Sequence, residues 1–171
     1  MQAEYLFQND KYYDASYDSG DKSVQCGRRV DSLKLYLYLV SKGDKILQQS
    51  VETVFHKVKW FTQRLVNFPR FRLVLPEFEG CTICFWYVPE SIDCMQDSQQ
   101  KMESLHKVCP AIKSRLVVEE GTVMINYQPL TCKRLPNFFR MVITCVPDMS
   151  EENLEFVINE IDRVGRLLYP S

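Results

Sequence analysis

The sequence lacks several features that would narrow its function at once. It has only two histidines among 171 residues, and its formal net charge is −1. A histidine-based catalytic triad is therefore not expected, and the even scatter of basic and acidic residues argues against a nucleic-acid partner. No apolar run approaches the roughly 20 residues that cross a bilayer, so no membrane partner is expected. What is left is an ordinary globular chain, long enough for one domain with its own core.

The cysteines do not form a recognisable framework. There are seven, an odd number that disfavours a secreted, disulfide-rich fold. Cys81 and Cys84 have Cys-x-x-Cys spacing, but Cys84 lies in the apolar run 83–88. No second pair or nearby histidine completes four zinc ligands. We therefore expect free, mostly buried thiols, and a reducing cytoplasmic location.

Apolar periodicity and turn residues predict a mixed α and β domain. Residues 4–27 show no periodicity and are expected to form a loop. Helices are predicted at 28–41, ending at Gly43, then along 51–65, along 102–116, and from a Ser150 N-cap to Pro170. Strands are predicted at 71–75, 82–88, 122–127 and 137–145. This order predicts an α+β fold, an antiparallel sheet with helices on one face.

Two details of the helices can be checked directly. The second helix is expected to bury one stripe, made of Val51, Val54, Phe55, Val58, Phe61 and Leu65. In the third helix, Pro110 predicts a kink or a break, because proline removes one backbone donor.

Arg140 is the most informative single residue, since it interrupts the apolar strand 137–143. A guanidinium buried in such a strand needs an anion, and its planar fork suits a carboxylate. The sequence leaves three interpretations open: a ligand's carboxylate, an internal salt bridge with a helix acid, or an edge strand on which Arg140 faces water.

Other candidates give weaker signals. Tyr13 lies beside Lys11 and Asp14 in the N-terminal loop, where a phenol can donate a proton once a loop closes, although most such tyrosines only make contacts. Gly27 precedes a predicted helix and allows a close backbone approach to an anion. Lys57 and Lys107 each follow a histidine, but both are predicted on the solvated side of a helix. A Schiff-base lysine needs a desolvating pocket, so neither is expected to be catalytic.

Taken together, the segments resemble the C-terminal third of the group II pyridoxal-phosphate decarboxylases, nearly from end to end. The resemblance is greatest to the branch that acts on acidic substrates, the cysteine sulfinate and glutamate decarboxylases. It rests on Tyr-Leu-Phe-Gln at 5–8, Tyr-Asp-Ser-Gly-Asp-Lys at 17–22, Gln-Cys-Gly-Arg at 25–28, Cys-Phe-Trp-Tyr-Val-Pro at 84–89, Tyr-Gln-Pro at 127–129 and Asn-Phe-Phe-Arg at 137–140.

The resemblance implies a role for each candidate. It implies decarboxylation of cysteine sulfinate, glutamate or aspartate through an aldimine of pyridoxal 5'-phosphate, in a homodimer with an aspartate-aminotransferase-like fold. Tyr13 would protonate the substrate α-carbon, Arg140 would bind the α-carboxylate, and Gly27 would lie near the substrate pocket. The chain would divide into a catalytic-loop segment (1–27), connecting helices (28–68) and a C-terminal small domain (69–171).

Two departures from the family stand out. The family's cofactor lysine lies in an Asn-Pro-His-Lys run upstream of the segment that matches 5–29, and a chain starting at Met1 leaves no room for it. We therefore expect the chain alone to be inactive. The run 131–136 also looks longer than usual. Three alternatives stay open: a fragment of an active decarboxylase, a non-catalytic module that pairs with a full-length decarboxylase or binds small carboxylates, or a poorly folded pseudogene product.

Overall fold

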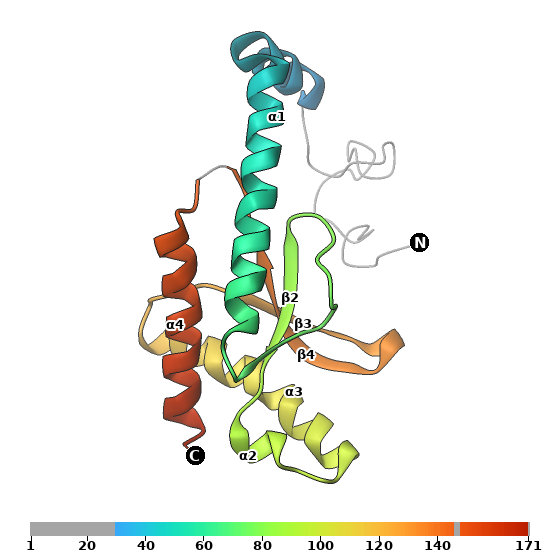
Figure 1. Cartoon of the computed structure of the whole chain (residues 1–171), viewed down its shortest axis with the longest axis vertical. Helices are drawn as coiled ribbons and strands as arrows, with labels where there is room; N and C mark the ends of the chain where they lie inside the picture. The colour runs from blue at the N-terminus through green and yellow to red at the C-terminus, as the bar shows by residue number, and fades with distance from the viewer. Residues whose placement is uncertain (1–29, 146–147, 171) are drawn as a thin grey trace, which may run out of the picture. The chain divides into compact units, whose positions relative to one another are not determined.

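The computed structural model describes residues 30–145 and 148–170 (Figure 1). By its internal contacts the chain divides into two compact units, residues 1–47 and residues 48–171. Tyr13 and Gly27 lie outside the described residues, so their predicted roles stay predictions. The division into segments 1–27, 28–68 and 69–171 also stays a prediction.

Helix α1 (Asp31–Val66) contains the predicted interruption at Gly43, whose φ of 73° and ψ of 173° are not helical. Glycine suits this position because it adopts positive φ without a Cβ penalty. After the interruption, α1 buries Val54, Val58, Phe61 and Leu65, as the apolar stripe predicted. Val51 and Phe55 are exposed instead, so the buried stripe of α1 is narrower than predicted.

Four antiparallel strands form one sheet in the order β1-β2-β4-β3. The strands are β1 (Phe71–Leu73), β2 (Thr82–Tyr87), β3 (Asn126–Leu130) and β4 (Leu135–Val142). All four were predicted, but β3 begins later than residue 122. Val123 and Ile125 are buried without pairing in the sheet, so their apolar alternation reflects burial and not a strand.

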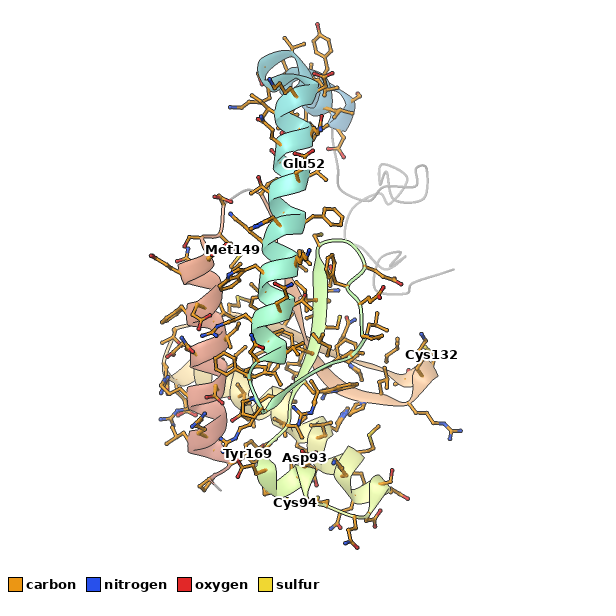
Figure 2. All side chains as sticks on the ribbon, in the orientation of Figure 1. Glu52, Asp93, Cys94, Cys132, Met149 and Tyr169 are labelled. Carbon is orange, nitrogen blue, oxygen red and sulfur yellow. The ribbon has the colours of Figure 1, made fainter. Side chains whose placement is uncertain are left out.

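The helices pack against one face of this sheet. They are α2 (Glu90–Asp93), α3 (Ser98–Ser114), which leads into a π-helical turn (Arg115–Glu119), and α4 (Glu151–Leu168). A 3-10 turn (Thr131–Lys133) joins β3 to β4, and Figure 2 shows Cys132 at the tip of this hairpin. Ser150 caps α4 as predicted, since its Oγ accepts a hydrogen bond from the Asn153 amide. The predicted α+β class is confirmed.

The core lies between the helices and this face of the sheet. Ile83, Phe85 and Tyr87 alternate along β2 and are all buried, opposite Phe139 and Met141 of β4. Phe61 of α1 packs on Phe85 with ring centroids 6.1 Å apart. The regular alternation therefore leaves the intervening side chains on the second face of the sheet.

Helix α3 continues through Pro110, so the predicted break there is wrong. Proline at this position leaves the carbonyl of His106, four residues earlier, without its helical donor. Asn137 of β4 replaces that donor, because its Nδ2 donates to the His106 carbonyl over 2.8 Å. Asn137 is itself buried. A side chain from the sheet thus compensates for the proline, and the buried face of α3 stays continuous.

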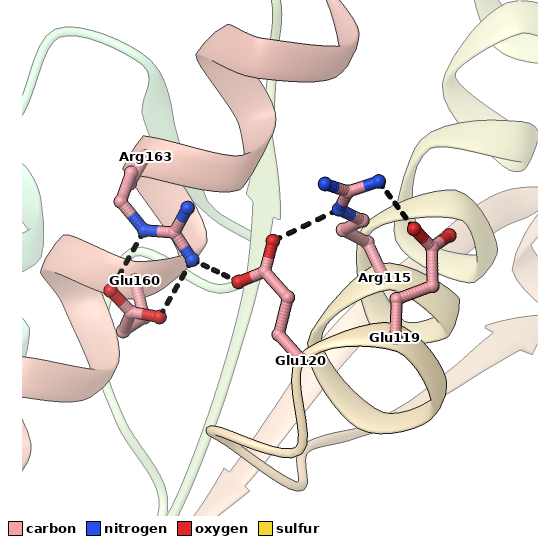
Figure 3. A network of polar contacts seen from close by, with 5 residues as sticks. All are labelled: Arg115, Glu119, Glu120, Glu160 and Arg163. Carbon is pink, nitrogen blue, oxygen red and sulfur yellow. Dashed lines mark hydrogen bonds and ion pairs between the residues drawn. The ribbon is translucent and has the colours of Figure 1, made fainter.

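A chain of five charged residues links the end of α3 to α4 (Figure 3). Glu120 accepts hydrogen bonds from Arg115 and Arg163, which in turn bind Glu119 and Glu160. The arginines lower the pKa of Glu120, mainly through the hydrogen bond from Arg163. The network fixes the π-helical turn against α4. Among the described residues, none of the helices combines the length and the apolar character that a membrane span needs.

Candidate functional site

Arg140 lies on β4, an internal strand with β2 on one side and β3 on the other. Its register partners are Cys84 of β2 and Asn126 of β3. Because Phe139 and Met141 point toward the helices, Arg140 points to the opposite face of the sheet, which α1, α3 and α4 do not cover. We call this surface the open face. Its side chains include Arg72, Cys84, Trp86, Asn126 and Arg140.

The side chain of Arg140 is exposed, as in the interpretation in which this residue faces water. The period-2 alternation of β4 decides this, since it assigns residue 140 to the open face. The described residues also provide no salt bridge for Arg140, which removes the internal ion pair as an interpretation within residues 30–145 and 148–170. Arg140 does face outward, but from the middle of the sheet and not from an edge strand.

The arginine that the fold buries is Arg70, which the sequence did not single out. Its guanidinium donates to the Tyr87 hydroxyl over 3.4 Å and to Glu90 Oε1 over 3.0 Å. Tyr87 is also within 3.4 Å of Asp162 Oδ1 on α4. Burial raises the pKa of Tyr87, while the hydrogen bond from Arg70 opposes that rise. This cluster joins β1, β2 and α4 and supports the strand that carries Cys84.

The neighbours of Arg140 are polar but not acidic. Burial raises the pKa of the Cys84 thiol, and the positive charge of Arg140 opposes this shift. Asn126 Oδ1 accepts a hydrogen bond from Lys113 Nζ over 3.2 Å, so this amide oxygen is engaged. Further along the open face, the Trp86 indole Nε1 is buried and has no hydrogen-bond partner among the described residues. The accessible group of this face is therefore the Arg140 guanidinium, which a carboxylate could bind.

The two lysines that follow histidines have different surroundings. Lys107 is exposed on α3, as predicted. Lys57 is not solvated as predicted, because its side chain is only 12% exposed and its Nζ pairs with Asp148. A Schiff-base lysine must be free to lose its proton and to react, and a carboxylate partner opposes both. Neither lysine therefore has the environment of a Schiff-base residue.

The described residues contain no group of three or more His, Cys, Asp or Glu side chains that could hold a metal ion. Cys81 and Cys84 are free thiols, as are Cys94, Cys109, Cys132 and Cys145. The expectation that these thiols are mostly buried is wrong, because only Cys109 of the six is buried, while Cys81 and Cys84 are half-buried and the other three are exposed.

Comparison with known proteins identifies the class to which this fold belongs. The structure superimposes on mouse CSAD with a TM-score of 0.71 and 38% sequence identity, covering 94% of this chain and 32% of that chain. For the apo form of mouse CSAD the TM-score is 0.72, with 35% identity and coverage of 96% and 35%. Oryza sativa TDC with PLP and tryptamine has the same fold, with a TM-score of 0.67 at 17% identity, covering 87% of this chain and 29% of that chain.

The family model of the pyridoxal-dependent decarboxylase conserved domain matches residues 1–88. The chain therefore belongs to the pyridoxal-dependent decarboxylase family, whose cofactor is pyridoxal phosphate. It spans about a third of the length of the mouse CSAD chains that it matches.

The described residues do not make a complete cofactor site. Neither Lys57 nor Lys107 suits a covalent link to the cofactor, for the reasons given above. Arg140 is accessible and lacks a carboxylate partner within the described part of the chain, and its role stays a prediction. Lys11 and Lys22 lie outside it, and the absence of a Schiff-base lysine stays a prediction.

Proposed function

We propose that this chain is the C-terminal portion of a decarboxylase that acts on an acidic amino acid, namely cysteine sulfinate, glutamate or aspartate. In this proposal Arg140 binds the α-carboxylate of the substrate, Tyr13 returns a proton to the α-carbon after carbon dioxide has left, and Gly27 borders the substrate pocket. The remainder of the decarboxylase holds pyridoxal phosphate, and the chain by itself is inactive. The 38% identity to mouse CSAD supports the choice of an acidic substrate.

The accessibility of Arg140 is the observation that carries the proposal. Arg140 is an exposed guanidinium on a strand whose neighbouring side chains are mostly buried and apolar. Here the guanidinium lies on the open face, between Cys84 and Asn126, with no carboxylate partner among the described residues. A planar fork in this position can bind a carboxylate through two parallel hydrogen bonds. The affinity of that pair increases further once surrounding protein excludes water.

Completion of the open face by more protein is part of the same proposal. Arg140 is exposed on this face, and a charge-assisted bond to a carboxylate becomes stronger where protein excludes water. We propose that the rest of the decarboxylase covers this face, within a homodimer. The free thiols support a reducing, cytoplasmic location.

The first experiment is to measure the intact mass of the native polypeptide in its source tissue. A mass far above 20.1 kDa supports the proposal, because the chain is then one piece of a longer decarboxylase. A mass of 20.1 kDa contradicts the proposal that this chain is one piece of a longer decarboxylase. It favours instead a non-catalytic module that pairs with a full-length decarboxylase or binds small carboxylates.

The second experiment tests the role of Arg140 in the longer polypeptide. Arg140→Ala should raise the KM for the amino acid by about 30-fold or more, because losing one partner of a desolvated charge pair costs at least ~2 kcal/mol. Arg72→Ala is the matched control, since Arg72 lies on the same face, against Trp86, and already donates to the carbonyls of Pro69 and Phe71. An unchanged KM for Arg140→Ala, or an equal rise for both variants, would refute the assignment.

The remaining roles have separate tests. Tyr13→Phe should abolish carbon dioxide release while substrate and cofactor binding persist, and wild-type turnover would contradict its role as the acid. The isolated chain, mixed with pyridoxal phosphate and reduced with borohydride, should give no stoichiometric adduct at a single lysine. Such an adduct would show that this chain does hold a Schiff-base lysine.

A further inference from the structure

A hollow of about 500 Å³ lies between α3 and the β3–β4 hairpin. Met102 and the apolar residues Pro129, Leu135 and Pro136 form much of its lining. A volume of this size is within the range of small-molecule sites, which are mostly apolar with a few placed polar groups. Part of the hairpin is the run 131–136, which is longer than usual in the family that the sequence resembles.

The best-placed polar group of the hollow is the His106 imidazole. Its Nδ1 accepts a hydrogen bond from the backbone amide of Asn137 over 3.3 Å. This bond fixes the ring and selects the tautomer that carries its proton on Nε2. The same Asn137 holds the His106 carbonyl that Pro110 leaves without a donor, so two bonds lock this residue to β4. His106 therefore presents a fixed N–H donor, for which the described residues show no acceptor.

Two cations line the same hollow, Lys107 of α3 and Arg134 of the hairpin. Neither has a salt bridge within residues 30–145 and 148–170, although Glu103 also lines the hollow. The Glu103 carboxylate instead accepts a hydrogen bond from Gln99 Nε2 over 3.2 Å. Arg134 has a φ of 55° in the left-handed region, which is strained for a residue with a Cβ. The hairpin thus holds an unneutralised guanidinium at the border of the apolar lining.

We propose that this hollow binds a small organic anion whose apolar body packs against Met102 and Leu135. The anionic oxygens, of a carboxylate or a phosphate, accept hydrogen bonds from His106 Nε2, Arg134 and Lys107. This site goes beyond the proposed decarboxylase function, because Arg140 is not among the described residues that line it. Charge complementarity with the two cations requires a ligand of negative charge. The apolar lining requires that the ligand also carry a hydrocarbon chain.

The test uses the His106 ring as its own reporter. The chain has two histidines, so His56→Gln leaves a single imidazole signal in a ¹H–¹³C spectrum. The probes are hexanoate and hexyl phosphate, with hexan-1-ol and acetate as controls for the apolar body and the charge. Saturable shifts of the His106 signal are expected with at least one of the two six-carbon anions, and about tenfold weaker binding of hexan-1-ol and acetate. Which anion binds more tightly identifies the preferred head group.

Two variants distinguish a specific binding site from nonspecific attraction of anions to positive charge. Arg134→Gln should weaken binding of the six-carbon anion about tenfold, because one charge-assisted bond is lost. Lys133→Gln is the matched control, since it makes the same charge change one residue away and Lys133 does not line the hollow. Circular dichroism verifies that both variants fold. Equal weakening by the two variants, equal binding of hexan-1-ol and hexanoate, or no saturation up to ~10 mM would overturn the proposal.

Discussion

The hydrogen bond that Asn137 donates to α3 leads to a specific prediction about the stability of the fold. Asn137→Leu conserves the volume of the side chain but removes the donor to the His106 carbonyl, which Pro110 leaves without a helical partner. The backbone amide of residue 137 still bonds His106 Nδ1, so only one interaction is lost. Leaving a part-buried acceptor unsatisfied should lower the free energy of unfolding by about 1–2 kcal/mol. Urea unfolding followed by circular dichroism measures this loss.

The same substitution in a Pro110→Ala background tests the mechanism. An alanine at 110 has the amide that proline lacks, and this amide can donate to the His106 carbonyl. The loss caused by Asn137→Leu should then shrink to below ~0.5 kcal/mol, so that the two sites are coupled by at least about 0.5 kcal/mol. An equal loss in the two backgrounds would refute the idea that Asn137 compensates for the proline.

Three further predictions concern the rest of the core and its charges. Gly165→Ala should destabilise the fold by about 1–3 kcal/mol, because the new Cβ would lie 2.3 Å from ring atoms of the buried Tyr87. This loss should exceed the gain from the better helix propensity of alanine. Thermal unfolding measures the change in stability, and a raised Tm would contradict the prediction. Burial raises the pKa of Cys109 to about 12, so in the native chain exposed Cys94 should be alkylated at pH 8 while Cys109 is protected, as peptide mass mapping can check. The stability that this raised pKa contributes is fully present below pH 9 and is lost as the pH rises toward 12. Arg163 lowers the pKa of Glu120, so the stabilising effect of this ion pair is present above pH 4.5 and lost as the pH falls. Arg163→Gln should therefore reduce the fall in the free energy of unfolding that acid causes. An unchanged dependence of the free energy of unfolding on pH would argue against the network of Figure 3.

Local patterns in the sequence determined most of the secondary structure. The strand at 82–87, the Gly43 interruption and the Ser150 cap each depend on residues close in the chain, and each was predicted correctly. Local pattern does not decide where β3 begins. Val123 and Ile125 have the alternation of a strand, but only a partner strand in the right register makes it one.

Tertiary structure decided which charged and polar groups are buried. The sequence favours Arg140 as the buried arginine, because its neighbours along the strand are apolar, yet the side-chain direction depends on which face the helices cover. Arg70 is buried instead, since Tyr87 and Glu90 meet it from other segments. Pro110 looks like a helix break until Asn137, distant in sequence, supplies the missing donor. Sequence alone therefore determined the family, the helices and the strands, because these depend on short-range patterns. The open face, the exposed Arg140 and the hollow beside His106 arise from contacts between distant segments, which only the folded chain brings together.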